Sequence, residues 1–284
     1  MAMTGKTRLA AVIGWPVGHS ISPRLHGYWL GHHGIDGAYM PLAVRLDDLA
    51  DAVRLLPRIG FVGFNVTVPH KEAVLALVDE VDPEALSIGA VNTVIVEAGG
   101  RLRGKNTDAF GFLQGLRSGF PDWDPGHGPV AVIGAGGASR AVCIALIDAG
   151  VTDLRLVNRT LARAEGVARD FGGPVTCVPW QHRSEALDGV ALLVNTTTQG
   201  MTGEAALDLD LASLPKAAAV MDIVYAPLET PLLASARARG NRVIDGLGMI
   251  LHQGRPGFAA WFGTEPEVTE ELRRHVLAGL DVGK

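Results

Sequence analysis

A glycine-rich turn is the first feature of the sequence that could do chemistry. The run Val130-Ala-Val-Ile-Gly-Ala-Gly-Gly-Ala-Ser139 predicts a buried strand, a tight turn and a helix that ends near Ala149. Gly134 permits the sharp turn, Gly136 lets backbone N–H groups approach a pyrophosphate, and the helix N-terminus adds positive partial charge. Ser139 stands where the dinucleotide fingerprint has Gly or Ala, so an ordinary strand-to-helix turn is the alternative. A strand before the turn, a helix after it and a second strand at the right distance favour a dinucleotide site.

The residues at the end of that second strand, 154–158, predict which dinucleotide binds. An NAD enzyme typically places an acid there against the ribose hydroxyls, but this sequence has Asn158-Arg159-Thr160, with Arg163 one turn later. Guanidinium groups suit a 2′-phosphate, so we expect a preference for NADP. The alternative is that the two arginines only decorate a solvated helix start.

Lys71 could exchange a proton with an alcohol or a ketone. In Asn65-Val-Thr-Val-Pro-His-Lys71, Asn65 and Thr67 share one face of a predicted strand, and Pro69 suits a first helical turn. The helix dipole disfavours a cation at that position by roughly 0.3 to 1 kcal/mol, which would lower the lysine pKa and help proton exchange. A lysine that points to solvent or pairs with a neighbouring acid is the alternative, and these residues alone leave both open.

Two further groups of polar residues precede predicted helices. Asp108 or Thr107 could simply cap a helix over residues 109–116, and Ser22 before Pro23 would also make a good N-cap. Ser20 and Ser22 could instead hold a carboxylate at the helix N-terminus. Physical reasoning alone favours capping at Asp108 and leaves the two serines undecided.

The elements that must position these residues alternate along almost the whole chain. Short apolar runs alternate with amphipathic stretches, which predicts an α/β protein with parallel sheet. The expected strands are 9–14, 39–44, 64–68, 90–96, 130–133, 154–158, 190–195, 218–225 and 242–244. The expected helices include 24–33, 46–56, 70–80, 160–170 and 231–239. A Pro/Gly-rich stretch over 121–129 suggests a domain boundary there.

Composition argues against several other classes of protein. The net charge of −5 and the scattered basic residues provide no stripe that could bind nucleic acid. No apolar run reaches the roughly 18 residues needed to span a bilayer, and no signal peptide is evident, so we expect a cytoplasmic protein without membrane contact. Cys143 and Cys177 form no CxxC, and the histidines have no metal-ligand spacing, so we expect no disulfide and no metal.

Taken in order, several motifs resemble those of the shikimate dehydrogenase family. They are Gly14-Trp-Pro-Val-Gly-His-Ser-Ile-Ser-Pro23, Asn65-Val-Thr-Val-Pro-His-Lys-Glu72, Ala90-Val-Asn-Thr93, Asn106-Thr-Asp108, Asn158-Arg-Thr160, and Gly246-Leu-Gly-Met249 with Gln253. Together they are far more specific than the glycine turn alone. The resemblance implies reversible, NADPH-dependent reduction of 3-dehydroshikimate to shikimate in aromatic amino-acid biosynthesis.

The resemblance also implies a role for each matching residue. Lys71 and Asp108 would form the catalytic pair, in which Lys71 donates a proton to the developing alkoxide and Asp108 orients Lys71 and a substrate hydroxyl. Ser20 and Ser22 would hold the substrate carboxylate. Contacts to the ring hydroxyls or neighbouring groups would come from Asn65, Thr67, Asn92, Tyr225 and Gln253. Contacts to NADP would come from Gly134, Ala135, Gly136, Gly137, Ala138, Asn158, Arg159, Thr160, Arg163, Thr196, Ile223, Gly246 and Met249.

The family architecture implied by this resemblance moves the domain boundary. A substrate-binding and catalytic domain would comprise residues 1–107 and 246–284, with a mainly parallel sheet, and a Rossmann-type NADP-binding domain would comprise 108–245. A cleft between them would hold nicotinamide against substrate. The sequence departs from the family at Ala109, Thr198-Gln199 and Gly254-Arg255, and Arg255 adds a charge near a predicted substrate contact.

Two other functions fit the same fold. A quinate/shikimate dehydrogenase paralogue would accept the extra hydroxyl of quinate and often favour NAD, but Ser20 with Ser22 and the run Asn158-Arg159-Thr160 argue against it. A non-catalytic ligand-sensing module would not need both Lys71 and Asp108. We expect a small molecule as the only partner besides the cofactor, in a monomer or a homodimer.

Overall fold

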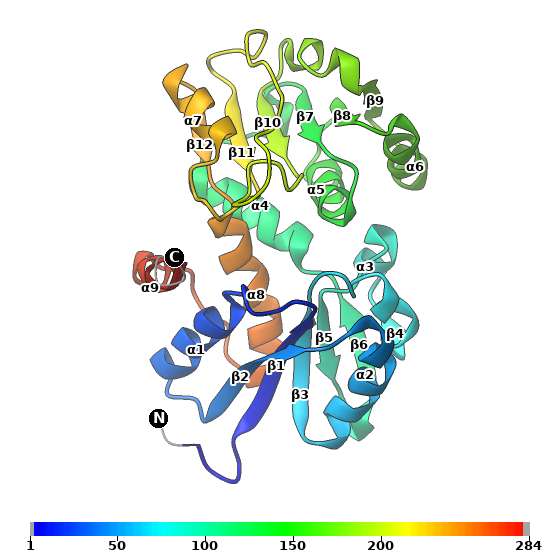
Figure 1. The fold of residues 1–284 in the computed structure, drawn as a ribbon, viewed down its shortest axis with the longest axis vertical. Coiled ribbons are helices and arrows are strands. Elements are labelled where there is room, and N and C mark those ends of the chain that lie inside the picture. Colours follow the sequence, from blue (N-terminus) through cyan, green and yellow to red (C-terminus); the bar gives the residue numbers. More distant parts are fainter. Residues whose placement is uncertain (1–2, 281–284) are drawn as a thin grey trace. The chain divides into compact units, whose positions relative to one another are not determined.

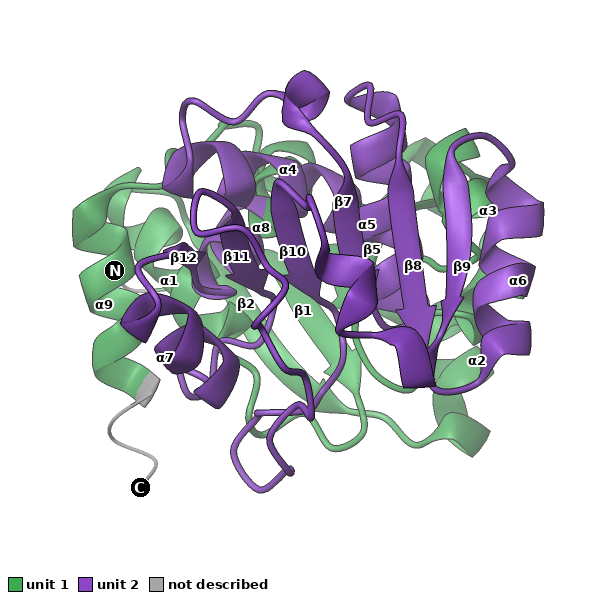
Figure 2. Ribbon diagram, turned by 90° about the horizontal axis from the view of Figure 1, so that it is seen from above, with its two compact units in different colours: residues 1–107, 253–284 green, residues 108–252 purple. Residues whose placement is uncertain are grey.

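The computed structural model describes residues 3–280, which form two compact units. Unit 1 comprises residues 1–107 and 253–284, and unit 2 comprises residues 108–252 (Figure 2). Each unit has its own six-stranded sheet and its own hydrophobic core. The α/β class predicted from the sequence is therefore confirmed.

The sheet of unit 1 is mixed. Its strand order is β2-β1-β3-β5-β6-β4 (Figure 1). Strand β1 pairs in parallel with β2 and β3, and β4 in parallel with β6, whereas β5 runs antiparallel to both β3 and β6. The strands are β1 (Arg8–Gly14), β2 (Gly37–Ala43), β3 (Phe61–Val66), β4 (Glu80–Val81), β5 (Thr93–Val96) and β6 (Leu102–Lys105).

The helices of unit 1 are mostly short. They are α1 (Ser22–His32), α2 (Leu49–Arg58), α3 (Pro83–Ile88) and α9 (Glu270–Leu280), with 3-10 turns η1 (Leu46–Asp48), η2 (Ala73–Ala76) and η3 (Ala98–Gly100). The predicted helix over 70–80 is wrong, because only η2 forms there. The backbone N–H groups of Asp79 and Asp82 donate to carbonyls of β6 and its end, Leu102 and Gly104, at 2.9 Å each. Pairing with β6 thus draws the end of this segment into a strand.

One hydrophobic cluster of unit 1 packs helix α2 against the sheet. Leu49, Val53 and Leu56 recur at helical spacing on α2 and pack with Phe64 and other sheet residues that are fully or almost fully buried. Burial of each such side chain stabilises the fold by about 1.5 to 3 kcal/mol relative to exposure. This packing fixes the strands whose ends carry the predicted substrate contacts.

The sheet of unit 2 is entirely parallel, in the order β12-β11-β10-β7-β8-β9. Its strands are β7 (Val130–Ile133), β8 (Leu154–Asn158), β9 (Val175–Pro179), β10 (Leu192–Asn195), β11 (Ala219–Asp222) and β12 (Arg242–Ile244). Its helices are α4 (Asp108–Gly119), α5 (Gly137–Asp148), α6 (Leu161–Phe171) and α7 (Pro231–Ala238), with η4 (Pro125–His127), η5 (Trp180–His182) and η6 (Glu185–Leu187). Edge strand β9 was not predicted, because its residues are only partly apolar and at most half-buried.

The strand order of unit 2 indicates where on its sheet a ligand would bind. From β7 the chain builds outward through β8 and β9, then returns to the other side of β7 for β10, β11 and β12. Ligands of doubly wound sheets bind outside the carboxyl ends of the strands, where this order reverses. In unit 2 that place lies between the ends of β7 and β10. Helix α8 (Leu247–Phe262) begins in unit 2 and ends in unit 1.

No helix within residues 3–280 combines the length and the apolar character needed to cross a bilayer.

Candidate active site

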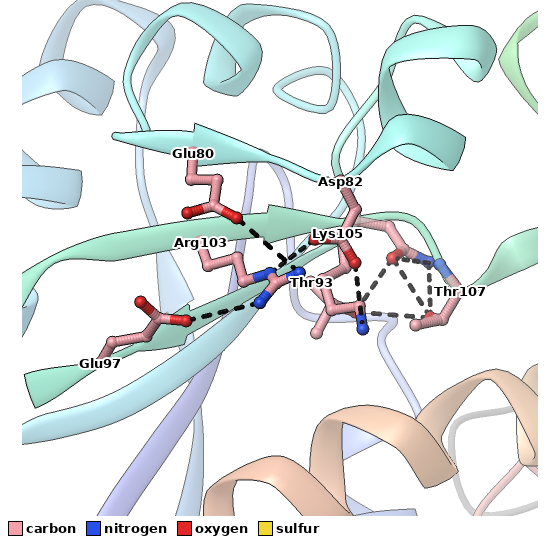
Figure 3. Close-up of polar contacts among 8 residues, drawn as sticks. Glu80, Asp82, Thr93, Glu97, Arg103, Lys105 and Thr107 are labelled. Atoms are coloured by element: carbon pink, nitrogen blue, oxygen red, sulfur yellow. Dashed lines mark hydrogen bonds and ion pairs between the residues drawn. The ribbon is translucent and has the colours of Figure 1, made fainter.

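Four polar residues, which are predicted site residues or their neighbours, meet at one edge of the unit 1 sheet. The Asn65 amide nitrogen donates to the Asn92 carbonyl at 3.1 Å and to the Thr93 hydroxyl at 3.0 Å. The Asn92 side chain accepts from the Thr107 N–H at 2.9 Å and donates to the Thr107 hydroxyl at 3.0 Å. Figure 3 shows Thr93 and Thr107 within this network. Antiparallel β5 makes this possible, because its start lies beside the end of β3.

Tyr39, on β2, joins two of the predicted substrate contacts. Its hydroxyl donates to Asn65 Oδ1 at 2.6 Å, and the Ser22 hydroxyl also hydrogen bonds to it. Burial raises the pKa of Tyr39 well above its ordinary value, with the Ser22 hydrogen bond opposing the rise. The ring of buried His26 stacks on the Tyr39 ring, with 4.0 Å between centroids. Tyr39 is therefore a neutral hydrogen-bonding group that fixes the orientation of the Asn65 amide.

Lys71 and Asp108, the predicted catalytic pair, belong to different units. Lys71 lies in the turn after β3, half-buried, and its carbonyl accepts from the Val91 N–H at 2.8 Å. Asp108 is the first residue of α4 and is 4% exposed. It directly follows Thr107, which is held by Asn92. A carboxylate that is this buried needs hydrogen-bonding partners, which suits a functional role as well as a structural one.

Of the two alternatives left open for Ser20 and Ser22, capping of helix α1 by Ser22 does not occur. The N-cap residue is Ile21, with no side-chain cap, and Ser22 is the first residue of the helix, followed by Pro23. The Ser22 N–H donates to the Ser20 hydroxyl oxygen at 3.3 Å. Because neither hydroxyl serves as the cap, the two serines remain candidates for binding a carboxylate at a helix N-terminus.

The remaining predicted contacts of unit 1 lie directly after β3 and on α8. Thr67 follows β3 and its N–H donates to the Ile13 carbonyl at 2.9 Å. Gln253 is half-buried on α8. Arg255, two residues on, is held by Glu265 at 3.0 Å and by the Pro266 carbonyl at 2.9 Å. These bonds tie the guanidinium to the segment after α8.

The glycine turn of unit 2 has the geometry that a pyrophosphate requires. Gly134 has φ of +111°, and a Cβ there would lie 2.7 Å from the Thr196 hydroxyl, so no other residue fits. Gly136 caps α5, and nothing lies within 4 Å of a Cβ built on Gly136 or Gly137. The first N–H groups of α5 therefore border open space. Ser139 is fully buried and donates to the Gly134 carbonyl at 2.6 Å, so its hydroxyl holds the turn together in place of the usual small residue.

The predicted 2′-phosphate site lies at the start of α6. Asn158 ends β8, and its amide donates to the Thr160 carbonyl at 2.8 Å. Thr160 is the N-cap residue of α6, and Arg159, Thr160 and Arg163 are all exposed. Neither arginine has an ion pair within the described part of the chain. Two available guanidinium groups beside a helix N-terminus suit a dianionic phosphate.

The other predicted cofactor contacts, and the predicted substrate contact Tyr225, lie at or just beyond the carboxyl edge of the same sheet. Thr196 follows β10, and its hydroxyl donates to the Ile133 carbonyl of β7 at 2.7 Å. Ile223 and Tyr225 follow β11, and Gly246 and Met249 lie at the start of α8. Ala135 and Ala138 flank the glycines of the turn and are half-buried. Burial raises the pKa of Tyr225. Thr196 borders the place where the strand order reverses, between β10 and β7, and the other residues follow β7, β11 and β12.

Four buried polar residues that hold the site in place were not predicted from the sequence. Tyr39, Thr93, Asn195 and Asp222 are buried and hydrogen bonded to predicted site residues or their neighbours. A polar residue inside an apolar strand was the only signal that could have indicated them.

Both cysteines are free thiols. Burial raises the pKa of the Cys143 thiol to about 12, and Cys177 lies apart on β9. No group of three His, Cys, Asp or Glu side chains in the described residues could hold a metal ion.

Two sequence-family models match this chain, one in each unit. The family model described as "Shikimate dehydrogenase substrate binding domain" matches residues 12–94, and "Shikimate / quinate 5-dehydrogenase" matches residues 126–203. A relative from Paramagnetospirillum magneticum, named shikimate dehydrogenase (NADP(+)), is 62% identical over 97% of this chain and 100% of its own length. A relative of the same name from Rhodospirillum rubrum is 58% identical over 97% and 99%.

Solved structures resemble the whole chain as well. Shikimate 5-dehydrogenase from Thermus thermophilus in complex with NADP(H) and shikimate has a TM-score of 0.86 and 40% identity, covering 96% of this chain and 99% of that one. Quinate dehydrogenase from Corynebacterium glutamicum in complex with NAD has a TM-score of 0.88 and 33% identity, covering 96% and 99%. The likeness extends over both units.

Proposed function

The chain belongs to the shikimate dehydrogenase family, and we propose that it catalyses the reversible, NADPH-dependent reduction of 3-dehydroshikimate to shikimate with Lys71 and Asp108 as its catalytic pair. It is an oxidoreductase of aromatic amino-acid biosynthesis, and NADP is its cofactor. The observation that carries the proposal is 62% identity, over almost the full length of both chains, to a relative named shikimate dehydrogenase (NADP(+)).

Reduction of the ketone needs a hydride at carbon and a proton at oxygen. Bound NADPH supplies the hydride. Lys71 is the proton donor to the carbonyl oxygen, and its charge stabilises the alkoxide as it forms. Asp108 supplies the carboxylate partner of the pair. In the reverse direction Lys71 takes the hydroxyl proton of shikimate.

The substrate is held by groups whose hydrogen-bonding capacity is already partly used. Both N–H groups of the Asn65 amide are donated, to Asn92 and Thr93, and Tyr39 occupies one lone pair of Oδ1. Asn65 can therefore offer the substrate one acceptor, which suits a ring hydroxyl. Ser20 and Ser22 hold the carboxylate, and Thr67, Asn92, Tyr225 and Gln253 contact the ring hydroxyls or groups next to them.

The cofactor is held by unit 2. The N–H groups between Gly134 and Ala138 would hold the pyrophosphate, and the open space around Gly136 and Gly137 supports this assignment. Asn158, Arg159, Thr160 and Arg163 bind the adenosine end with its 2′-phosphate. Thr196, Ile223, Gly246 and Met249 would contact the nicotinamide. The exposure of Arg159 and Arg163, without ion pairs in the described residues, supports NADP over NAD.

The proposal also gives each domain a separate role and the protein a cellular location. The substrate-binding and catalytic domain is residues 1–107 with 246–284, and the NADP-binding domain is residues 108–245. The protein works in the cytoplasm as a monomer or a homodimer.

A matrix of two substrates and two cofactors tests the proposal. Oxidation of shikimate and of quinate is measured, each with NADP⁺ and with NAD⁺. We expect kcat/KM to be highest for shikimate with NADP⁺, because the 2′-phosphate gains charge-assisted hydrogen bonds from Arg159 and Arg163. Preference for quinate with NAD⁺ would establish the paralogue instead. Absence of turnover in every combination would establish a binding module.

A further inference from the structure

Asp222 is a fully buried carboxylate at the end of β11. It is 0% exposed, and its Oδ1 accepts from the Asn195 amide and from the Val224 N–H at 3.0 Å each. Its Oδ2 accepts from the Thr230 hydroxyl at 2.7 Å. Within the described part of the chain Asp222 has no ion pair, so these donors alone stabilise its charge. An ionised group without solvent or a cation depends strongly on the placement of such donors.

Each donor belongs to a different segment at the carboxyl edge of unit 2. Asn195 ends β10, and its Oδ1 accepts from the Thr197 N–H at 3.0 Å and the Thr197 hydroxyl at 2.8 Å. Val224 directly precedes Tyr225. Thr230 is the N-cap residue of α7, where its hydroxyl also accepts from the Leu233 N–H at 3.3 Å.

Backbone bonds connect the same segments to one another. The Ile223 N–H donates to the Asn195 carbonyl at 3.1 Å, and the Thr202 N–H donates to the Ala226 carbonyl at 2.9 Å. The Gly246 N–H donates to the Val224 carbonyl at 3.2 Å. The two loops after β10 and β11 and the start of α8 therefore form one connected edge, with Asp222 at its buried centre.

We propose that Asp222, paired with Asn195, is a positioning residue of the reaction, which fixes the loops that present Thr196, Ile223 and Tyr225 to nicotinamide and substrate. This inference rests on the proposed function for the roles of those three residues. Asp222 itself is too deeply buried to contact either ligand. It acts by accepting three hydrogen bonds, which join the end of β10, the residues just after β11 and the start of α7.

Two substitutions at Asp222 distinguish loss of the hydrogen bonds from loss of the negative charge alone. Asp222→Ala removes both acceptor oxygens and with them all three hydrogen bonds, and displacement of the loops by about 1 Å lowers kcat about 100-fold. We expect KM for shikimate and the dissociation constant of NADPH to rise about tenfold with it. Asp222→Asn keeps one acceptor oxygen for Asn195 and Val224, and the Thr230 hydroxyl can turn to accept from the new amide. This conservative variant should recover most of the activity lost in Asp222→Ala.

Substitution at Asn195 adds a signature that simple loss of stability cannot produce. Asn195→Asp places a second carboxylate beside Asp222, in place of the amide that now donates to it. Two adjacent carboxylates share a proton at lower pH and repel each other when both are ionised. The activity of Asn195→Asp relative to the unmodified protein should therefore increase as pH falls from about 8 to about 6. The double variant Asn195→Asp/Asp222→Asn restores one amide and one carboxylate, so this pH dependence should disappear.

Asn241→Ala is the matched control. Asn241 is also a buried amide of unit 2, but it donates to carbonyls of Pro215, Lys216 and Ala218, before the start of β11. Its loss should lower the melting temperature without changing KM or NADPH binding. The inference is overturned if Asp222→Ala keeps kcat, KM and the NADPH dissociation constant within about twofold, or if Asn195→Asp shows the pH profile of the unmodified protein.

The two proposals fail in different ways. If the unmodified protein oxidises no shikimate, the proposed function fails, and the NADPH dissociation constants of the same variants still test the positioning role. If the unmodified protein is active and the variants follow Asn241→Ala, the positioning role fails alone.

Discussion

Backbone contacts fix the turn that carries Lys71. The Val91 N–H donates to the Lys71 carbonyl at 2.8 Å, and Nε2 of His70 lies 2.7 Å from the Val44 carbonyl. A carbonyl can only accept, so His70 holds its proton on Nε2. His70 is fully buried, and it ties the turn after β3 to the end of β2. The direction in which the lysine leaves the backbone is thereby set before substrate binds.

Lys71→Ala should lower kcat by about 100- to 10,000-fold, the contribution typical of general acid–base catalysis. The dissociation constant of NADPH should stay nearly unchanged, since the residues predicted to bind the dinucleotide lie in unit 2. Steady-state kinetics with shikimate and a fluorescence titration of NADPH measure the two quantities.

Lys105→Met provides the control for this prediction. Lys105 ends β6 and pairs with Asp82 at 3.1 Å, as Figure 3 shows. The pair is partly exposed and contributes little to stability. We expect this variant to keep kcat within about twofold. Unchanged turnover in Lys71→Ala would show that its proton-transfer role is misassigned.

At the scale of elements, antiparallel β5 decides which residues share the substrate edge. Its register pairs Asn65 with Thr93 and Thr93 with Lys105. Residues near the start of β5 and after the end of β6 consequently lie beside the end of β3. A parallel β5 would have taken Asn92 to the opposite edge, away from Asn65.

Helix α8 packs on this sheet at a position where only glycine fits. A Cβ on Gly63, in β3, would lie 1.9 Å from Nε1 of Trp261, whose N–H donates to the Val94 carbonyl at 3.0 Å. Gly63→Ala must displace the indole and break that bond. We expect a loss of about 1 to 3 kcal/mol in the free energy of unfolding, as for an overpacked core.

Urea unfolding of Gly63→Ala measures this loss, and Gly27→Ala on α1, where a Cβ has nothing within 4 Å, is the control. Helical alanine is favoured over glycine by up to about 1 kcal/mol, so the control should be at least as stable as the parent. Equal stability of both variants would mean that β3 and α8 are not packed this closely.

At the scale of the whole molecule, His26 makes stability depend on pH. Its side chain is 1% exposed, and burial lowers its pKa to about 3. In the unfolded chain a histidine titrates near 6.5. Between these values the unfolded state binds one more proton, so the free energy of unfolding falls by about 1.4 kcal/mol for each pH unit below about 6. Asp222 acts in the opposite direction, because burial raises its pKa.

Urea unfolding at pH 7, 6, 5 and 4 checks this effect. His26→Phe keeps a flat ring beside Tyr39 but cannot take up a proton. The free energy of unfolding of this variant should fall less steeply with decreasing pH than that of the parent. The difference in slope should be about 1.4 kcal/mol per pH unit. Parallel pH dependences for the two proteins would assign the acid sensitivity to other groups.

The sequence by itself determined the features that are local or cumulative. The glycine turn of β7 and α5 lies within about ten residues, and its strand, turn and helix each follow from neighbouring side chains. The family followed from motifs along almost the whole chain, and the α/β class from the alternation of elements. None of these depends on which strands pair.

Only the tertiary structure decided how distant residues combine. The antiparallel course of β5, the contacts of Tyr39 with Asn65 and Ser22, and the pairing of Asn195 with Asp222 all depend on sheet order and register. The failed helix at 70–80 has the same origin, since β6 takes part of that segment as a partner. Periodicity reports which face of an element is apolar, but it carries no information on the neighbour that the face or edge meets.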